Sequence, residues 1–231
     1  MGIIMVNQKT SILLPSAYRH HNLGRSLHAL FDTIGNNSVE VLISLVDDDD
    51  HSLAVLEGLP VCVYFRMWDE YNKGAVYAWN NLASRSSGDV LALWADDLYP
   101  QAGWLDRALR YIDDGFGLVG FNDLNTDGDV YAAHWCASRD WLNQIGGVMY
   151  PPQYYCWWSD REMTERAQSA RKYVWGQDCI VEHRHYSFGS APIDSTYQQA
   201  MPYYPIDERI YIERKAMGYP IDYQPVMAVT V

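Results

Sequence analysis

The sequence has few cysteines and few basic residues, and both shortages restrict its possible functions. Its four cysteines include no C-x-x-C pair, so a cysteine-rich zinc site is not expected. Seventeen Lys and Arg residues stand against 29 Asp and Glu residues, which gives a formal net charge of −12. A general nucleic-acid surface needs the opposite balance, because Lys and Arg replace the counterions of the phosphate backbone. We therefore expect no general nucleic-acid surface on this protein.

Long hydrophobic runs are lacking as well. No apolar segment reaches the ~20 residues that a membrane-spanning helix needs, and the N-terminal residues lack the apolar core of a secretory leader. Together with thiols that are expected to be free, this pattern favours a cytoplasmic location. The sequence shows no repeats, low-complexity tracts or strong linkers, so residues 1–231 are expected to form one domain.

Short apolar runs alternate with helical patterns along the first half of the chain. The runs predict buried strands at Ser11–Ser16, Val39–Val46, Val61–Phe65, Val90–Trp94 and Leu118–Phe121. The helical patterns lie at Asn22–Ile34, Ala75–Ala83 and Trp104–Ile112. This alternation predicts an α/β domain with a mainly parallel, Rossmann-like sheet flanked by helices. The second half is less regular, with helices expected at Asp160–Ala170, with Ser159 as N-cap, and at Asp207–Met217, and a strand at Asp178–His185.

Acidic residues follow two of the predicted strands. In parallel sheets, ligands bind outside the carboxyl ends of the strands, and here those ends carry Asp47–Asp50 and the pair Asp96-Asp97. Adjacent carboxylates repel each other unless a cation or protons compensate, and Mg²⁺ or Mn²⁺ accepts oxygen ligands. The pair therefore suggests a divalent metal site, with an acidic turn or helix cap as the alternative. The run of four acids has a second interpretation as a solvated loop.

Two segments of the second half could also carry chemistry. Asp160 follows the aromatic segment that ends at Trp158, and burial beside aromatic rings could raise its proton affinity enough for it to act as a general base. The alternative is that Asp160 only stabilises the positive end of a helix dipole. His183 and His185 occupy alternate positions of a predicted strand, and an imidazole there could bind a metal. A structural histidine is the alternative.

Taken in order, these segments resemble the family 2 glycosyltransferases, which have a GT-A fold. The resemblance runs from about Ser11 to about Tyr197. It rests on SILLPS followed by Arg19, on VLISLVDD, on the Lys73-Gly74 pair, on SGD, on LALWADDLYPQAGWL, on IGG, on DREM and on the Glu182-His183 pair. One departure is Ala95, which stands where a full D-x-D motif has its first acid.

The resemblance implies a metal-dependent, inverting transfer of a sugar from a nucleotide-diphosphate sugar to an acceptor hydroxyl. It implies that residues 9–100 bind the nucleotide sugar, that residues 101–200 hold the acceptor and the catalytic base, and that residues 201–231 form a C-terminal helix and tail. The donor-binding residues that it implies are Pro15, Ser16, Arg19, Asp47, Asp48, Gly74 and Asp96. Asp97 and His183 would bind Mn²⁺ or Mg²⁺, and Asp160 would be the base, with Glu162 as its competitor.

Three other functions stay open at the level of sequence. Ala95 leaves room for a non-catalytic GT-A domain that binds a sugar or a partner. A transferase acting on modified DNA bases is a second possibility, although the basic residues form no stripe. A nucleotidyltransferase is the third, but the first strand lacks the Gly-rich phosphate loop that such enzymes usually carry. The sequence leaves the acceptor open among a glycan, a protein, a lipid-linked sugar and a modified base, and it leaves the donor and the oligomeric state undetermined.

Overall fold

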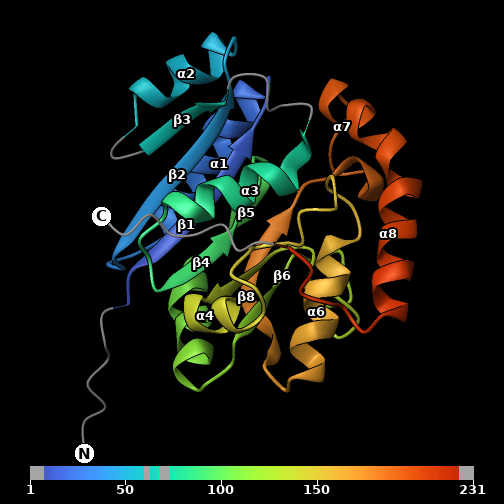
Figure 1. Ribbon diagram of the computed structural model, residues 1–231. Coiled ribbons are helices and arrows are strands. Elements are labelled where there is room, and N and C mark those ends of the chain that lie inside the picture. The colour runs from blue at the N-terminus through green and yellow to red at the C-terminus, as the bar shows by residue number, and fades with distance from the viewer. Residues whose placement is uncertain (1–7, 60–62, 68–72, 224–231) are drawn as a thin grey trace, which may run out of the picture.

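A computed structural model describes residues 8–59, 63–67 and 73–223. These residues form one α/β domain in which a curled mixed sheet has helices on both faces (Figure 1). Across the sheet the strands follow the order β3-β2-β1-β4-β7-β6-β8-β5. Their bounds are Thr10–Ser16 for β1, Val39–Val46 for β2, Val63–Met67 for β3, Val90–Leu93 for β4, Leu98–Pro100 for β5, Leu118–Asn122 for β6, Trp135–Ser138 for β7 and Tyr173–His183 for β8.

Helices connect the strands and cover the sheet. Their bounds are His20–Thr33 for α1, Asp50–Glu57 for α2, Gly74–Arg85 for α3, Trp104–Asp113 for α4, Arg139–Gln144 for α5, Ser159–Ser169 for α6, Ser195–Ala200 for α7 and Tyr204–Ala216 for α8, with short 3-10 turns at Tyr186–Phe188 and Met201–Tyr203. Among the described residues, no helix combines the length and the apolar character needed to cross a bilayer.

The core forms two apolar layers because successive side chains of a strand point to opposite faces of the sheet. Ile12 and Leu14 of β1 contact the layer that contains the buried residues of α1 and α4, whereas Leu13 contacts the layer that contains those of α3 and α6. Helix α1 supplies its layer through Leu23 and Leu27, one turn apart and fully buried. Both faces of the central strands are therefore apolar, as expected for strands covered by helices on each side.

The predicted mainly parallel sheet needs one correction. Strands β1, β2, β3 and β4 pair in parallel, and β6 pairs with β8 in parallel, but β7 runs antiparallel to both β4 and β6. The reason is that β7 returns between β4 and β6, so these two strands keep the same direction. Strand β5 also pairs antiparallel, with β8. As a result, the carboxyl ends of β1, β4, β6 and β8 meet at one edge of the sheet.

Most predicted elements are confirmed, with shifted ends. Residues 61 and 62 of the third predicted strand lie outside the described residues, and β3 extends to Met67. Strand β8 begins at Tyr173, five residues before the predicted start, and ends at His183, so His185 lies beyond it. Ser159 is not the N-cap of α6: that position belongs to Trp158, and Ser159 is the first helical residue. The sequence patterns did not indicate α2, α5, α7, β5 or β7.

Candidate active site

A cavity of about 410 Å³ opens at the edge of the sheet where the carboxyl ends of β1, β4 and β8 meet. Eight of the ten residues that the sequence prediction assigned to a site line it: Pro15, Ser16, Arg19, Gly74, Asp96, Asp97, Asp160 and His183. Residues predicted separately, from segments far apart in the sequence, therefore share one cavity. Neither Asp47 nor Asp48 is among the described residues that line the cavity.

The acidic run after β2 is largely a helix-capping turn. The carboxylate of Asp49 is buried, accepts a hydrogen bond from the backbone N–H of Ser52 at 3.1 Å, and so caps α2. Its second oxygen accepts one from the backbone N–H of Tyr18 at 2.7 Å. Asp48 accepts a hydrogen bond from the Tyr18 hydroxyl at 2.6 Å. Asp49 thus joins the turn to the loop after β1, and a donor-binding role for Asp47 and Asp48 stays a prediction.

The two acids after β4 have different surroundings. Asp96 is buried; it accepts a hydrogen bond from Ser16 Oγ at 2.7 Å and a charged one from the guanidinium of Arg19. Asp97 Oδ2 accepts a hydrogen bond from the Tyr197 hydroxyl at 2.6 Å, and Asp97 Oδ1 lies 3.5 Å from His183 Nε2. Protein donors therefore hold Asp96 in place, while Asp97 keeps one oxygen directed at an imidazole.

These surroundings shift the acidity of Asp97. Burial alone would raise the pKa of its carboxyl, but the nearby imidazole of His183, the charge of Arg19 and the hydrogen bond from Tyr197 outweigh burial and hold that pKa well below its usual value. The carboxylate is thus ionised over the physiological range. Asp97 Oδ1 is also buried and has no hydrogen-bond partner among the described residues.

Arg19 connects the loop after β1 to the residues at the start of α7. Its Nε donates to Asp194 at 2.9 Å, one Nη donates to the Tyr197 hydroxyl at 2.7 Å, and the guanidinium also stacks on the Tyr197 ring. Burial would lower the pKa of Arg19, but Asp96 and Asp97 raise it above its ordinary value. Arg19 therefore provides internal positive charge beside the acid pair. The sequence predicted a role for Arg19 but not its contact with Asp194, the N-cap of α7, 175 residues away.

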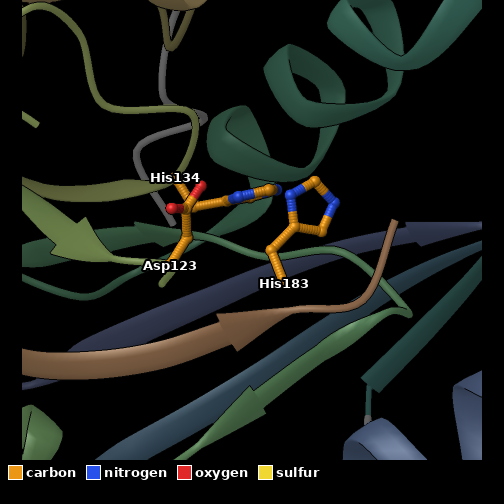
Figure 2. A group of neighbouring side chains, drawn as sticks. All are labelled: Asp123, His134 and His183. Atoms are coloured by element: carbon orange, nitrogen blue, oxygen red, sulfur yellow. The ribbon is translucent and has the colours of Figure 1, made fainter. Parts of the chain in front are cut away.

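A second group of possible metal ligands also includes His183. Asp123, His134 and His183 each offer a ligand atom within 4.8 Å of the others, and Figure 2 shows the three side chains converging. Asp123 follows β6 just as Asp96 follows β4, so the same signal of an acid after a strand could have identified it. His134 lies in the loop before β7, where no periodic pattern marks it.

Asp160 and Glu162, the two candidate bases, have contrasting environments. Asp160 lies in the first turn of α6 and lines the cavity, where burial raises its pKa to about 6. Glu162 has no exposed surface; its carboxylate accepts hydrogen bonds from Tyr154 at 2.8 Å, from Arg166 at 2.9 Å and from Arg214 at 2.9 Å. Glu162 is therefore fully engaged in joining α6 to α8, whereas Asp160 faces the cavity with a proton affinity suited to a base.

An aromatic segment before α6 forms another wall of the cavity. The carboxylate of Asp207, on α8, accepts hydrogen bonds from the backbone N–H groups of Tyr155, Cys156 and Trp157 at 2.8–3.2 Å. The Tyr155 ring stacks on Tyr203 with centroids 3.6 Å apart. Helix α8 thus fixes this wall through main-chain atoms and leaves its side chains to shape the cavity.

Two backbone positions are specialised for this wall. Gly74 has φ +85°, and a Cβ added there would lie 2.4 Å from the carbonyl oxygen of Tyr155, so only glycine fits at the start of α3. Trp158 has φ +64°, in the left-handed region that a bulky residue rarely adopts. Such conformations cost free energy and often occur at functional sites.

Comparisons with known proteins agree with this fold. The model of the family described as Glycosyl transferase family 2 matches residues 11–191. A mannosyltransferase from Pyrobaculum calidifontis, solved in complex with GDP-Man and Mn²⁺, superposes with a TM-score of 0.67 at 13% identity, over 90% of this chain and 64% of that one. TarS 1–349 from S. aureus gives 0.59 at 15% identity over 75% of this chain and 59% of that one, as does its complex with UDP.

The chain spans a little under two thirds of these solved chains, and at such identities the superpositions establish the GT-A fold alone. A search of curated protein sequences found no match. The family model covers SILLPS and the acid pair after β4, and it ends before Asp194, Tyr197 and Asp207. Part of this cavity is therefore built by residues beyond the family match.

Proposed function

Because the chain belongs to glycosyl transferase family 2, we propose that it transfers a sugar from a nucleotide-diphosphate sugar to an acceptor hydroxyl, with a divalent cation and with inversion. One observation carries the proposal: Asp160, a carboxyl group with a pKa of about 6, lines the same cavity as the acid pair after β4. A general base and the groups that hold a nucleotide diphosphate must share a cavity for a single displacement to occur.

The donor would bind where the ends of the first strands and the start of α3 meet. The residues proposed to contact it are Pro15, Ser16, Arg19, Asp47, Asp48, Gly74 and Asp96. Arg19 contributes positive charge toward a diphosphate, and Ser16 with Arg19 keeps Asp96 fixed through the hydrogen bonds already described. These groups are proposed to act mainly on donor affinity.

Asp97 and His183 are proposed to hold the cation, Mn²⁺ or Mg²⁺. Their fit rests on Asp97 Oδ1, a buried carboxylate oxygen that has no hydrogen-bond partner among the described residues and lies 3.5 Å from an imidazole nitrogen. Carboxylate and neutral imidazole are ligands that divalent ions accept. When bound, the cation would neutralise charge that develops on the leaving diphosphate.

Asp160 is proposed to take the proton of the acceptor hydroxyl. The acceptor oxygen then bonds to the anomeric carbon as the bond from that carbon to the diphosphate oxygen breaks, and the nucleoside diphosphate leaves with the electron pair. Inversion follows because one displacement occurs and no covalent sugar–enzyme intermediate forms. The aromatic wall from Tyr155 to Trp158 would flank the acceptor and exclude water, which strengthens electrostatic interactions in the site.

The test is a donor screen. The solved structures with the same fold bind GDP-Man and UDP, so GDP- and UDP-sugars are the first donors to titrate by isothermal calorimetry with Mn²⁺. Release of the nucleoside diphosphate is then followed with and without simple sugar acceptors. Binding of a donor together with Asp160-dependent release supports the proposal. A donor that binds but is never turned over would instead indicate the non-catalytic GT-A domain.

A further inference from the structure

The surroundings of His183 contain more metal-ligating groups than the proposed function uses. Asp123 follows β6, His134 precedes β7 and His183 ends β8, and one ligand atom from each lies within 4.8 Å of the other two. Two atoms bound to one ion at usual bond lengths of about 2.0–2.3 Å lie up to about 4.5 Å apart. Three atoms spread evenly around one ion at these bond lengths lie about 3.5–4.0 Å apart, so the three side chains (Figure 2) need only a small shift to share an ion.

Each of these side chains has a buried polar atom that nothing else satisfies. Asp123 Oδ2, His134 Nδ1 and His183 Nδ1 lack a hydrogen-bond partner among the described residues. Asp123 is 1% exposed and His134 is 6% exposed. Buried polar groups without partners are rare because each loses its hydration without compensation. These atoms belong to the same three side chains whose ligand atoms lie within 4.8 Å of one another, which points to a ligand bound by this group.

The Asp123 carboxylate is held in position for such a ligand. Its Oδ1 accepts hydrogen bonds from the backbone N–H of Asn125 at 2.9 Å, and from the backbone N–H and the hydroxyl of Thr126 at 2.7 Å and 2.9 Å. The loop is also tied to β8, because the amide of Asn125 donates to the carbonyl of His183 at 2.7 Å. One carboxylate oxygen is thus used to shape the loop, and the other remains available.

We propose that Asp123 and His134 join His183 in binding that cation, so that these three side chains add two imidazoles and a carboxylate to the Asp97 carboxylate proposed above. The proposal rests on the proposed function only in placing that cation at His183. Imidazole nitrogens suit Mn²⁺, Co²⁺, Zn²⁺ and Fe²⁺, whereas Mg²⁺ prefers oxygen ligands and retains most of its water. The site is therefore selective for a transition metal over Mg²⁺.

The experiment measures Mn²⁺ binding directly, by the loss of the free-ion EPR signal, with neither donor nor acceptor present. His134→Ala and Asp123→Asn are each expected to weaken Mn²⁺ binding about tenfold or more, the scale of a lost ligand or ligand support. The Asn side chain keeps an oxygen for the bonds from Asn125 and Thr126, so this variant preserves the loop. The control is His28→Ala, an exposed histidine on α1, which should bind Mn²⁺ like the wild type.

Thermal unfolding of each variant is measured with and without Mn²⁺. The wild type should gain more from Mn²⁺ than from equal Mg²⁺, because stabilisation follows the ratio of ligand concentration to dissociation constant. Should the His134 and Asp123 variants fold and bind Mn²⁺ as tightly as the wild type, the inference is wrong. Metal binding that depends on His134 without any sugar transfer would instead reject the proposed function and leave this site standing.

Discussion

Replacing Asp160 by asparagine tests the proposed chemistry most directly. The substitution keeps the size of the side chain and its hydrogen bond from the backbone N–H of Arg161, at 2.8 Å in the native protein, but removes the charge that would accept a proton. We expect transfer to fall by about a hundredfold or more, the scale of a lost general base. Donor affinity in the presence of Mn²⁺ should stay close to that of the wild type, since Asp160 is not proposed to touch the nucleotide.

The pKa of Asp160 gives the prediction a second, quantitative part. A carboxyl group with a pKa of about 6 is about 97% ionised at pH 7.5 and about 9% ionised at pH 5. Only the ionised form can take the proton, so kcat/KM should rise with pH and level off above about pH 7, with a change of about tenfold over that range. In Asp160→Asn, the residual activity should lose this dependence.

The assay is steady-state release of the nucleoside diphosphate at several pH values, at saturating Mn²⁺. Asp140→Asn is the matched control, because Asp140 occupies the same position, second in its helix, at the exposed start of α5. It should retain wild-type activity at each pH. Full activity in Asp160→Asn, or a pH profile that it shares with the wild type, would refute the assignment of the base.

Three further predictions concern stability and donor binding. Glu162→Gln removes the buried carboxylate that Arg166 and Arg214 share and leaves Arg214 with Asp222 alone, so the free energy of unfolding should fall by about 3 kcal/mol in a denaturant titration; unchanged stability would contradict a structural role. Gly74→Ala brings a Cβ to within 2.4 Å of the Tyr155 carbonyl at a positive φ, so the melting temperature should drop by several degrees, corresponding to about 1–3 kcal/mol. Arg19→Ala and Asp47→Ala should each weaken donor affinity, measured by calorimetry, more than they lower turnover. If both variants bind the donor as tightly as the wild type, the proposed orientation of the donor is wrong.

Local patterns in the sequence predicted a large part of the fold. Strand β2 is found at the predicted residues, Val39–Val46, because six apolar residues, interrupted only by Glu40 and Ser44, end at an abrupt run of acids. Short elements escaped prediction, since a strand of three or four residues such as β5 or β7 offers too few positions for a period to show. Their place in the sheet depends on neighbours far away in the chain.

The candidate site was predictable only where chemistry coincides with a strand end. The proximity of Asp97 and His183 is confirmed, at 3.5 Å, and it followed from placing both at carboxyl ends of strands. His134 and Tyr197 carry no such mark, because each reaches the site from a loop or a short helix whose direction is set by tertiary contacts. Nor does the sequence separate Asp160 from Glu162; the difference arises because Arg214, 52 residues further on, neutralises one of them.

The way Asp207 holds the aromatic wall bears on how the lining of this cavity could change. Its carboxylate binds main-chain N–H groups that almost any amino acid supplies. Substitutions at Tyr155, Cys156 and Trp157 can therefore alter the lining of the cavity while the loop keeps its course. Descendants of this sequence, or a directed library at these three codons, have a cavity wall on which ligand preference can diversify without first losing the fold.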